Sequence, residues 1–327
     1  MNNLKRIFII FFFLVLIYFI LSILIYTISS FTLLKGKVLD FKIITEYQRN
    51  FYHQLGFRKI WQHQQECIEY DKDLIFKPRH GSCKFDNVEF KTQLNFSYKG
   101  RVHNTNLKLN TERTKGIAVI GDSQAMGWGV NDDETFSYIL EKKIRKPVYN
   151  LAVSGYSTKR EILALEKSKL IDKIDIVIIQ YCNNDYNENI YFSENKSNNN
   201  YLKFEQIYLN NFSIFKRLRK GFRYAVTIPL KNSEKRLDWR KEEQYFLNIL
   251  NNYDFLKEKK IIIIYANGHE IYYDNFKLNS ETNIKNINFI NIDYEKKDFF
   301  LIDGHLNKEG HAKIANKLYD FITKKKY

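Results

Sequence analysis

An uninterrupted apolar segment near the N-terminus is the strongest pattern along the chain. Residues 7–28 include no charged side chain, and nearly all of them are Ile, Leu, Phe, Val or Tyr. A helix of this length, at ~1.5 Å per residue, spans roughly 33 Å, which is enough to cross a ~30 Å hydrocarbon core. A signal peptide has a shorter apolar core followed by a small-residue cleavage site, and Ser29 and Ser30 form only a poor one. The pattern therefore predicts an uncleaved single-pass anchor, with its cytoplasmic tip, in residues 1–31.

Basic residues flank this span on both sides, so they do not decide its orientation. Lys5 and Arg6 precede it, and Lys35, Lys37 and Lys42 follow it. An excess of Lys and Arg normally marks the cytoplasmic side, and here neither side has a clear excess. We nevertheless expect the N-terminus inside and the larger part of the chain outside the cytoplasmic membrane, in the periplasm or at the cell surface.

Three cysteines give this expectation some support. Cys67 and Cys83 lie 16 positions apart, and in an oxidising compartment they could form a disulfide that contributes ~3 kcal/mol through loop closure. The alternative is two separate buried thiols. Cys182 would remain outside such a pair.

Residues 32–115 follow the anchor, and we interpret them as a linker and an N-terminal cap. Residues 47–63 are rich in aromatic side chains and Gln, and they predict a helix that continues from the anchor. Residues 73–81 contain Pro, Gly and Asp, which is typical of a turn between short strands.

From residue 116 the pattern changes to alternating strands and helices. Short apolar runs predict buried parallel strands at 116–121, 148–151, 174–181, 261–265 and 287–292. Helical periodicity covers 134–145, 158–171 and 308–322, and Thr158 with Glu161 has the spacing of a capping box. Strands separated by helices predict an α/β fold with a parallel sheet and helices on both faces, in a domain from 116 to 327.

A long insertion, about 186–240, separates the third and fourth of these strands. Its first part is rich in Asn, and residues 212–224 combine Phe and Ile with several Lys and Arg. This second part could be a basic amphipathic lid on the bilayer or on an anionic polymer, or a surface helix with a solvated basic face.

Polar clusters stand where three of the predicted strands end, which is the edge of a parallel sheet where ligands bind. A fourth cluster precedes the last helix. The four are Gly121-Asp122-Ser123, Gly155, Asn183-Asn184-Asp185 and Asp303-Gly304-His305. They supply what acyl transfer requires: a Ser that attacks, a His that takes its proton, an Asp that orients the His, and N–H donors for the oxyanion.

The clusters occur in the order of the four sequence blocks of the SGNH (GDSL-like) hydrolase superfamily, which the chain resembles over about 116–320. The resemblance implies a flavodoxin-like three-layer α/β/α fold. It also implies that Ser123 is the nucleophile, His305 the base and Asp303 its partner. The oxyanion hole would consist of the N–H groups of Ser123 and Gly155 and the side chain of Asn184.

Two positions depart from the usual blocks. Cys182 stands where the third block normally has Gly, and only Gly304 separates Asp303 from His305, where two residues are usual. Some membrane-anchored branches of the superfamily look similar, with an Asp-x-His-Leu-Asn-x-x-Gly-His ending that residues 303–311 match. A relative that folds but no longer catalyses would keep the same blocks, so this alternative stays open.

Other residues have weaker patterns. His311 is expected to support a helix start, and His269 to cap a loop or line the crevice. Trp128 is expected to form a pocket wall or to pack under the turn at Ser123. No dinucleotide, phosphate-loop, zinc or nucleic-acid motif occurs, so we predict neither a cofactor nor a metal. The net charge of +15 is spread along the chain, and it could favour anionic envelope polymers or lipid headgroups, or only solubility.

These observations lead to one main hypothesis and two alternatives. The main one is a serine esterase that hydrolyses an acyl ester, such as O-acetyl, on an envelope glycan. An O-acetyltransferase would use the same acyl-enzyme with a sugar hydroxyl in place of water. A membrane-anchored scaffold would bind glycan in the crevice without catalysis.

Overall fold

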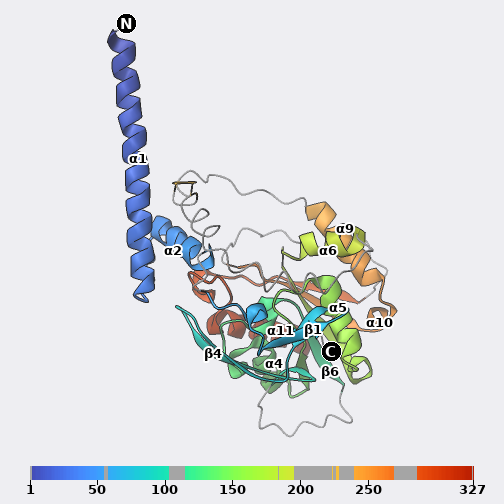
Figure 1. The fold of residues 1–327 in the computed structure, drawn as a ribbon. Helices are drawn as coiled ribbons and strands as arrows, with labels where there is room; N and C mark the ends of the chain where they lie inside the picture. The colour runs from blue at the N-terminus through green and yellow to red at the C-terminus, as the bar shows by residue number, and fades with distance from the viewer. Residues whose placement is uncertain are drawn as a thin grey trace.

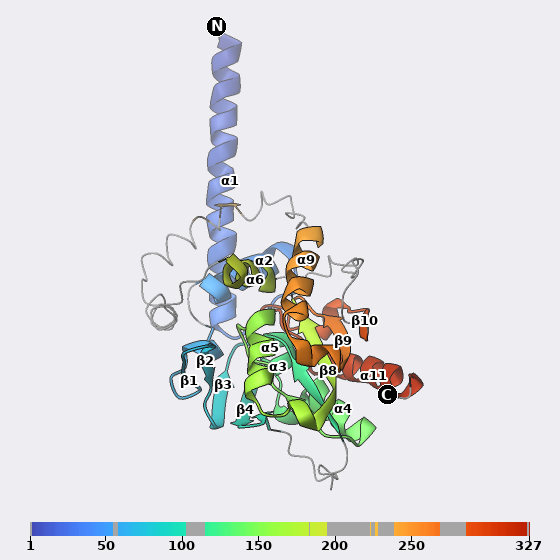
Figure 2. The same cartoon turned by 90° about the vertical axis from the view of Figure 1, so that its right-hand side faces the viewer.

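A mixed β-sheet forms the centre of the molecule. The computed structural model describes residues 2–54, 58–102, 115–182, 184–194, 223, 226–227, 239–268, 286–325 and 327. Within these ranges, eight strands form one sheet in the order β10-β9-β8-β6-β7-β5-β4-β3 (Figures 1 and 2). Most of the predicted insertion, including residues 212–224 apart from Arg223, lies outside the described residues, as do Asn183 and His269.

Five strands make the parallel half of the sheet that the sequence predicts. They are β6 (Gly116–Ile120), β7 (Val148–Asn150), β8 (Ile174–Tyr181), β9 (Lys260–Tyr265) and β10 (Ile287–Ile290). β6 lies between β7 and β8, so the chain moves outward in one direction after β6 and in the other after β7. This is the flavodoxin-like order, in which ligands bind beyond the carboxyl ends of the central strands, a region called the crevice below. The expected α/β fold is confirmed.

Helices cover both faces of this half because successive strand residues point to opposite faces. Ile117 and Val119 pack with residues of α4 (Phe136–Ile144) and α11 (Lys308–Lys324) on one face. Ala118 and Ile120 pack with residues of α5 (Thr158–Lys167), α9 (Trp239–Asn251) and α10 (Asp254–Lys257) on the other. The result is a three-layer α/β/α domain.

The N-terminal region extends the same sheet. β3 (Gly81–Asp86), β4 (Lys91–Ser97) and β5 (Gly100–Arg101) are antiparallel, and β5 pairs with β7 through Arg101 and Asn150. β1 (Ile68–Asp71) and β2 (Ile75–Pro78) form a separate hairpin. A disulfide joins Cys67, just before β1, to Cys83 in β3, with 5.8 Å between their Cα atoms.

Two local expectations were wrong. The helix expected over 47–63 is two elements, α2 (Lys42–Gln54) and the 3-10 turn η1 (Trp61–His63), because the backbone is extended at Ile60. α2 does not continue from the anchor, since α1 (Asn2–Leu34) ends before a turn with Gly36 at φ +71°. The N-cap of α5 is Ser157 rather than Thr158, whose hydroxyl instead lies 3.4 Å from Asp185 Oδ2.

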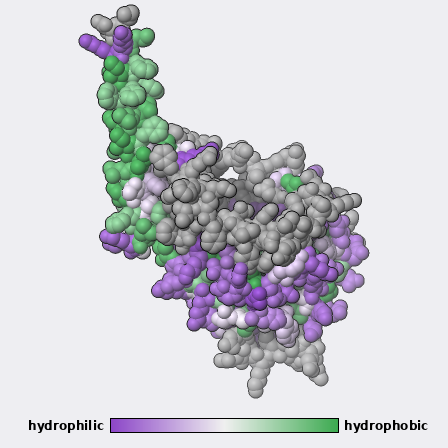
Figure 3. Space-filling view, in the orientation of Figure 1, coloured by the Kyte–Doolittle hydropathy of each residue, from purple (hydrophilic) through white to green (hydrophobic). Residues whose placement is uncertain are grey.

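Short elements connect the larger ones. They are α3 (Ser123–Met126), η2 (Asp132–Glu134), η3 (Ile171–Lys173), α6 (Asp185–Glu194) and η5 (Lys296–Asp298). α1 rises out of the domain as one long apolar helix, while the visible domain surface is mainly hydrophilic where it is coloured (Figure 3). Among the described residues, α1 alone is long and apolar enough to cross a membrane, and it could be an anchor or a signal sequence.

Candidate active site

The turn after β6 presents Ser123 at the carboxyl edge of the sheet. β6 is fully buried, and α3 starts at Ser123 itself, with Asp122 as its N-cap accepting from the Gln124 N–H at 2.8 Å. From β8, the Gln180 side-chain oxygen accepts from the N–H groups of Asp122 (3.2 Å) and Ala125 (3.1 Å). The neighbouring strand therefore holds the turn in place, while the Ser123 side chain stays partly exposed.

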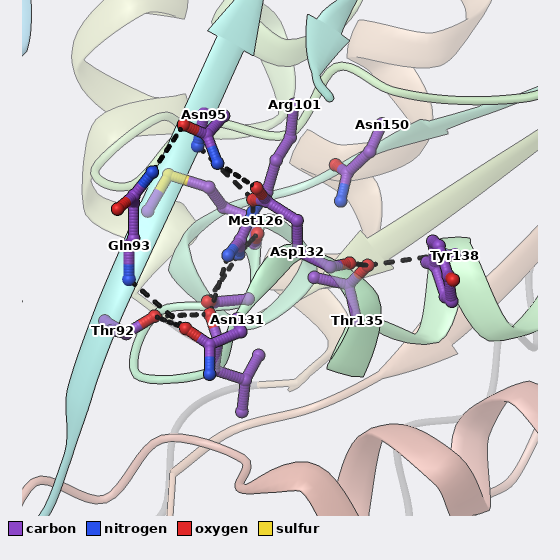
Figure 4. A network of polar contacts seen from close by, with 12 residues as sticks. Thr92, Gln93, Asn95, Arg101, Met126, Asn131, Asp132, Thr135, Tyr138 and Asn150 are labelled. Carbon is purple, nitrogen blue, oxygen red and sulfur yellow. Dashed lines mark hydrogen bonds and ion pairs between the residues drawn. The ribbon is translucent and has the colours of Figure 1, made fainter. Parts of the chain in front are cut away.

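A buried arginine supports the far end of the same turn. Arg101 of β5 donates to the backbone oxygens of Met126, Gly127 and Val130, each at 2.6 Å, and its Nε lies 2.7 Å from Asp132 Oδ1 (Figure 4). Gly127 has φ +81°, and a Cβ there would lie 2.6 Å from the guanidinium. A larger residue at 127 would therefore be strained and would also displace Arg101.

Ser123, His305 and Asp303 lie in one hydrogen-bonded chain. The His305 Nε2 is 2.7 Å from the Ser123 Oγ, and its Nδ1 is 2.5 Å from the Asp303 Oδ1. The Leu306 N–H donates to the Gln124 side-chain oxygen at 2.9 Å, which ties the His305 loop directly to the Ser123 turn. Ser123 is about 180 positions away from Asp303 and His305 in the sequence, and the fold brings the three residues together.

Residues from the N-terminal region surround the Asp303 carboxylate. The Arg58 Nε lies 2.9 Å from Asp303 Oδ2, and the Tyr52 hydroxyl donates to the same oxygen at 3.1 Å. The Trp128 Nε1 is 3.5 Å from that oxygen, so Trp128 contacts the proposed acid, and its ring packs edge-on against the Phe85 ring of β3. The Asp303 side chain has no exposed surface.

Glu89 fixes the loop that carries Asp303. Its Oε2 accepts from the backbone N–H groups of Ile302 (2.9 Å) and Asp303 (2.6 Å). Arg58 also reaches His305, with 3.4 Å between its Nη2 and the Nδ1. The Asp303 carboxylate thus contacts the Arg58 cation, the Tyr52 hydroxyl and the Trp128 indole N–H, and Glu89 holds the backbone on which it is carried.

This environment determines the ionisation of Asp303. Burial alone would raise its pKa, but the charges of Arg58 and His305 act in the opposite direction and hold the pKa well below its usual range. Asp303 is therefore ionised throughout the neutral range and can accept from the imidazole. Burial, followed by the charge of Arg58, lowers the pKa of nearby His53 to about 4, so His53 is neutral at pH 7.

The expected oxyanion donors lie beside the Ser123 turn. The Val153 N–H donates to the Gly121 oxygen at 3.0 Å, which places the loop with Gly155 against the turn. Gly155 has φ +82°, a conformation that favours Gly. The exposed Asn184 donates through Nδ2 to Asp122 Oδ2 at 3.2 Å, next to Ser123 in the chain. An amide carries two such hydrogens, and this contact uses one.

Cys182 and His311, two further residues that the sequence singled out, are buried and contact other parts of the fold rather than Ser123. Cys182 is buried, and its Sγ lies 3.1 Å from the Asn267 Oδ1. His311 is buried in α11, and its Nδ1 accepts from the Phe136 N–H at 3.2 Å, so it supports the start of α4. Within the ranges that the structure describes, no group of three or more His, Cys, Asp or Glu residues is placed to hold a metal ion.

Sequence reasoning missed Arg58, Tyr52, Glu89 and Arg101. Each lies in the region without a recognisable family signature, and each acts through contacts with residues far away in sequence. A single Arg or Tyr in a polar segment has no local pattern that reveals such a partner. The pairing of β5 with β7 brings Arg101 to the site, and the packing of α2 on the Asp303 loop brings Tyr52.

The three-layer α/β/α fold brings a serine, a histidine and an aspartate into one hydrogen-bonded chain at the carboxyl ends of its parallel strands. The sequence profile of the GDSL-like lipase/acylhydrolase family matches residues 117–318, and the chain belongs to this family. It is accordingly an esterase or acylhydrolase of the serine type, in the SGNH hydrolase superfamily. No curated protein matches the chain.

Solved structures with a similar chain path have low sequence identity. A putative lipolytic protein of the G-D-S-L family from Desulfitobacterium hafniense is 13% identical, with a TM-score of 0.39, and the match covers 63% of this chain and 99% of that one. A two-domain esterase active on acetylated mannans is 13% identical, with a TM-score of 0.38 and coverages of 64% and 50%. A carbohydrate esterase family 2 enzyme from Corynascus thermopiles (Myceliophthora fergusii) is 12% identical, with a TM-score of 0.38 and coverages of 68% and 68%.

Proposed function

We propose that Ser123, His305 and Asp303 are the nucleophile, general base and orienting acid of this esterase. One observation carries the proposal: the continuous chain of hydrogen bonds from the Ser123 Oγ through both imidazole nitrogens to Asp303. Asp303 is ionised at neutral pH and accepts a hydrogen bond from His305 Nδ1, so the imidazole proton stays on Nδ1. The Nε2 is then left unprotonated and faces the serine hydroxyl, as a general base requires.

The reaction follows from these positions. The Ser123 Oγ attacks the acyl carbonyl carbon while His305 Nε2 takes its proton, and the tetrahedral intermediate carries the negative charge on the former carbonyl oxygen. His305 then returns the proton to the leaving alcohol as the C–O bond breaks, which leaves an acyl-serine. A water, deprotonated by His305, attacks the carbonyl carbon of this ester. His305 then returns the proton to the Ser123 Oγ as the bond between that oxygen and the acyl carbon breaks, which releases the acid and regenerates the serine.

The oxyanion is proposed to be bound by the N–H groups of Ser123 and Gly155 and by the Asn184 amide. The contact between Asn184 and Asp122 supports this assignment because it holds the amide beside the nucleophile turn and uses only one of the two amide hydrogens. Donors that are already oriented stabilise the charge that develops in the transition state without further reorganisation.

The proposed substrate is a short acyl ester, such as O-acetyl, on a glycan of the cell envelope. The apolar α1 supports a location at the membrane, through residues 7–28 as an anchor. The Cys67–Cys83 disulfide supports an oxidising compartment outside the cytoplasm. The division into an anchor (1–31), a cap (32–115) and a hydrolase domain (116–327) is part of the same proposal.

A combined labelling and turnover experiment tests the function. The full chain, solubilised in detergent, is given a chromogenic acetyl ester and, separately, a serine-reactive phosphonate whose position is located by mass spectrometry. Turnover together with labelling at Ser123 is the expected result. Labelling with slow turnover that a sugar acceptor accelerates would indicate a transferase, and neither turnover nor labelling would indicate a scaffold.

A further inference from the structure

A single buried side chain joins the end of α1 to α2. Gln48 has no exposed surface. Its Nε2 lies 3.0 Å from the Thr32 Oγ1 and 2.9 Å from the Lys37 oxygen, and its Oε1 accepts from the Leu39 N–H at 2.9 Å. A buried amide with all its groups engaged is costly to release into a non-bonded state, so this junction is a packed joint rather than a flexible tether.

The same helix reaches the proposed catalytic acid. One turn beyond Gln48, Phe51 and Tyr52 pack with Leu33 of α1 and with Ile302, and the Tyr52 hydroxyl donates to Asp303. α1, α2 and the loop of the active site therefore form one contiguous packed unit. The orientation of the crevice relative to the axis of α1 is set by this packing.

The exposed segment of α1, residues 4–21, has the length of a hydrocarbon core. In this segment no described side chain is buried, and Ser22 is the first that is, at 4% exposure. These 18 residues span about 27 Å at ~1.5 Å per residue, against roughly 30 Å for the core of a bilayer. If α1 spans the membrane, contact with the rest of the chain begins in the last turn of this segment, where the Tyr18 hydroxyl donates to the Val226 oxygen at 2.8 Å.

The carboxyl edge of the sheet faces the side where that bilayer would lie. α2, α6 and α9 lie on the side toward which α1 rises, and α4 and β4 lie on the opposite side, in both views (Figures 1 and 2). α6 starts at Asp185, shortly after β8 ends at Tyr181, so the ends of the central strands point the same way. Ser123, Gly155 and Asn184 follow these strand ends.

The start of α2 has side chains suited to a headgroup layer. α2 runs in the same direction as α1, since the Tyr47 ring lies 5.7 Å from the Tyr26 ring while Phe51, one turn later, packs with Leu33. Its first residues therefore point toward the bilayer. There Phe41 and Ile43 are 66% and 42% exposed on either side of Lys42, which is typical of a segment at the boundary between headgroups and acyl chains.

We infer that the crevice acts on an acyl ester whose carrier is anchored in the same bilayer as α1, as in a lipid-linked glycan. This rests on the proposed esterase function and narrows its substrate class. A crevice held against its own bilayer meets carriers that diffuse in that bilayer at high effective concentration. The same orientation directs the crevice away from esters that are carried on a different membrane.

Reconstituted vesicles test the inference with the full chain. The protein is placed in vesicles of phosphatidylethanolamine and phosphatidylglycerol. One chromogenic acetyl ester is supplied in three forms: free in water, tethered to a lipid in the same vesicles, and tethered to a lipid in separate vesicles. The rate on the free ester normalises each preparation for accessible enzyme. We expect the same-vesicle ester to be hydrolysed at least about tenfold faster than the separate-vesicle ester.

Two variants separate orientation from simple tethering. A flexible Gly/Ser insertion after Gly36, where an added Cβ would contact nothing within 4 Å, lets the domain turn away from the bilayer. Gln48→Leu keeps the chain length and removes the polar joint. Both should leave the rate on the free ester unchanged, and both should raise the rate on the separate-vesicle ester several-fold.

The outcomes are distinguishable from a failure of the function itself. Equal rates on same-vesicle and separate-vesicle esters in the wild-type chain would overturn the inference while leaving the esterase in place. A preference that persists unchanged in both variants would also overturn it, because tethering alone would then explain the preference. If no form of the ester is hydrolysed, the proposed function fails, and the inference fails with it.

Discussion

Two regions of the chain meet at the Asp303 carboxylate and contribute different kinds of residues. The sheet domain supplies Ser123 and His305, which stand at strand ends or near the last helix. The N-terminal region supplies Arg58 and Tyr52, which both contact the Oδ2 of the carboxylate, while His305 contacts its Oδ1. The comparison teaches that the reacting atoms and the control of their ionisation come from separate parts of the sequence. The first part carries a family signature and the second does not.

Removing a reacting group should have the largest effect and should leave the N-terminal contacts intact. Ser123→Ala and His305→Ala are each expected to lower kcat by at least about 10³-fold, since the proposed triad acts as a unit. Ester turnover by the full chain measures this, with circular dichroism as the check of folding. Ser168→Ala, far from the crevice at the end of α5, is the matched control. Activity above about a tenth of wild type in either variant would refute the triad.

The oxyanion donors should rank second. Asn184→Ala is expected to lower kcat by ~10²–10³-fold with little change in KM, because the amide gains strength only as charge develops on the oxygen. Separate determination of kcat and KM checks this, and Asn183→Ala is the control. If the two substitutions exchange their effects, the donor is Asn183. If neither matters, the third block is only a turn.

Removal of the Cys67–Cys83 disulfide should change the stability of the N-terminal region without altering the reacting groups. Replacing both Cys67 and Cys83 by Ser is expected to reduce the free energy of unfolding by about 3 kcal/mol, the loop-closure contribution for a bridge of this span. Urea unfolding followed by fluorescence measures it, and wild-type protein under reducing conditions should behave like the variant. The same stability with and without reductant would show that the bridge does not form in solution.

Arg58 offers the smallest but most specific test, through pH. The folded-state pKa of Asp303 is depressed, so its contribution to stability is present above the ordinary carboxyl value of about 4 and is lost as the pH falls through the lower folded value. Without Arg58, burial is less opposed and the pKa rises. Arg58→Gln should therefore move both the acid-unfolding midpoint and the acid limb of kcat/KM to higher pH.

Arg58→Lys is the control for charge in this experiment. A lysine keeps the positive charge but loses the planar fork, so its shift should be smaller than that of the Gln variant. Profiles of Arg58→Gln that coincide with wild type would show that Arg58 packs near the acid without influencing it.

The parts of the molecule that sequence reasoning predicted share a physical cause. Runs such as residues 174–181 are buried on both faces, so composition alone marks β8 to the residue. The strand-end clusters follow from the topology of a parallel sheet, which brings distant turns to one edge. The placement of Tyr52 against Asp303 depends instead on how α2 packs, and neither residue's neighbours in sequence predict it. The N-cap of α5 shifted from Thr158 to Ser157 for a related reason, since the Thr158 hydroxyl is drawn toward Asp185.

Arg101 has a consequence for the order in which the chain is assembled during synthesis. Its guanidinium is satisfied by backbone oxygens at 126, 127 and 130 and by Asp132, and its strand pairs with Asn150. A cation without these partners costs too much to bury, so it must stay in water until they exist. The hairpin of β3 and β4 can form as soon as it is made, whereas β5 has to wait for about fifty further residues. β5 is thus completed only after β7 has been made, and a chain stalled before β7 exposes an open strand edge to chaperones and proteases.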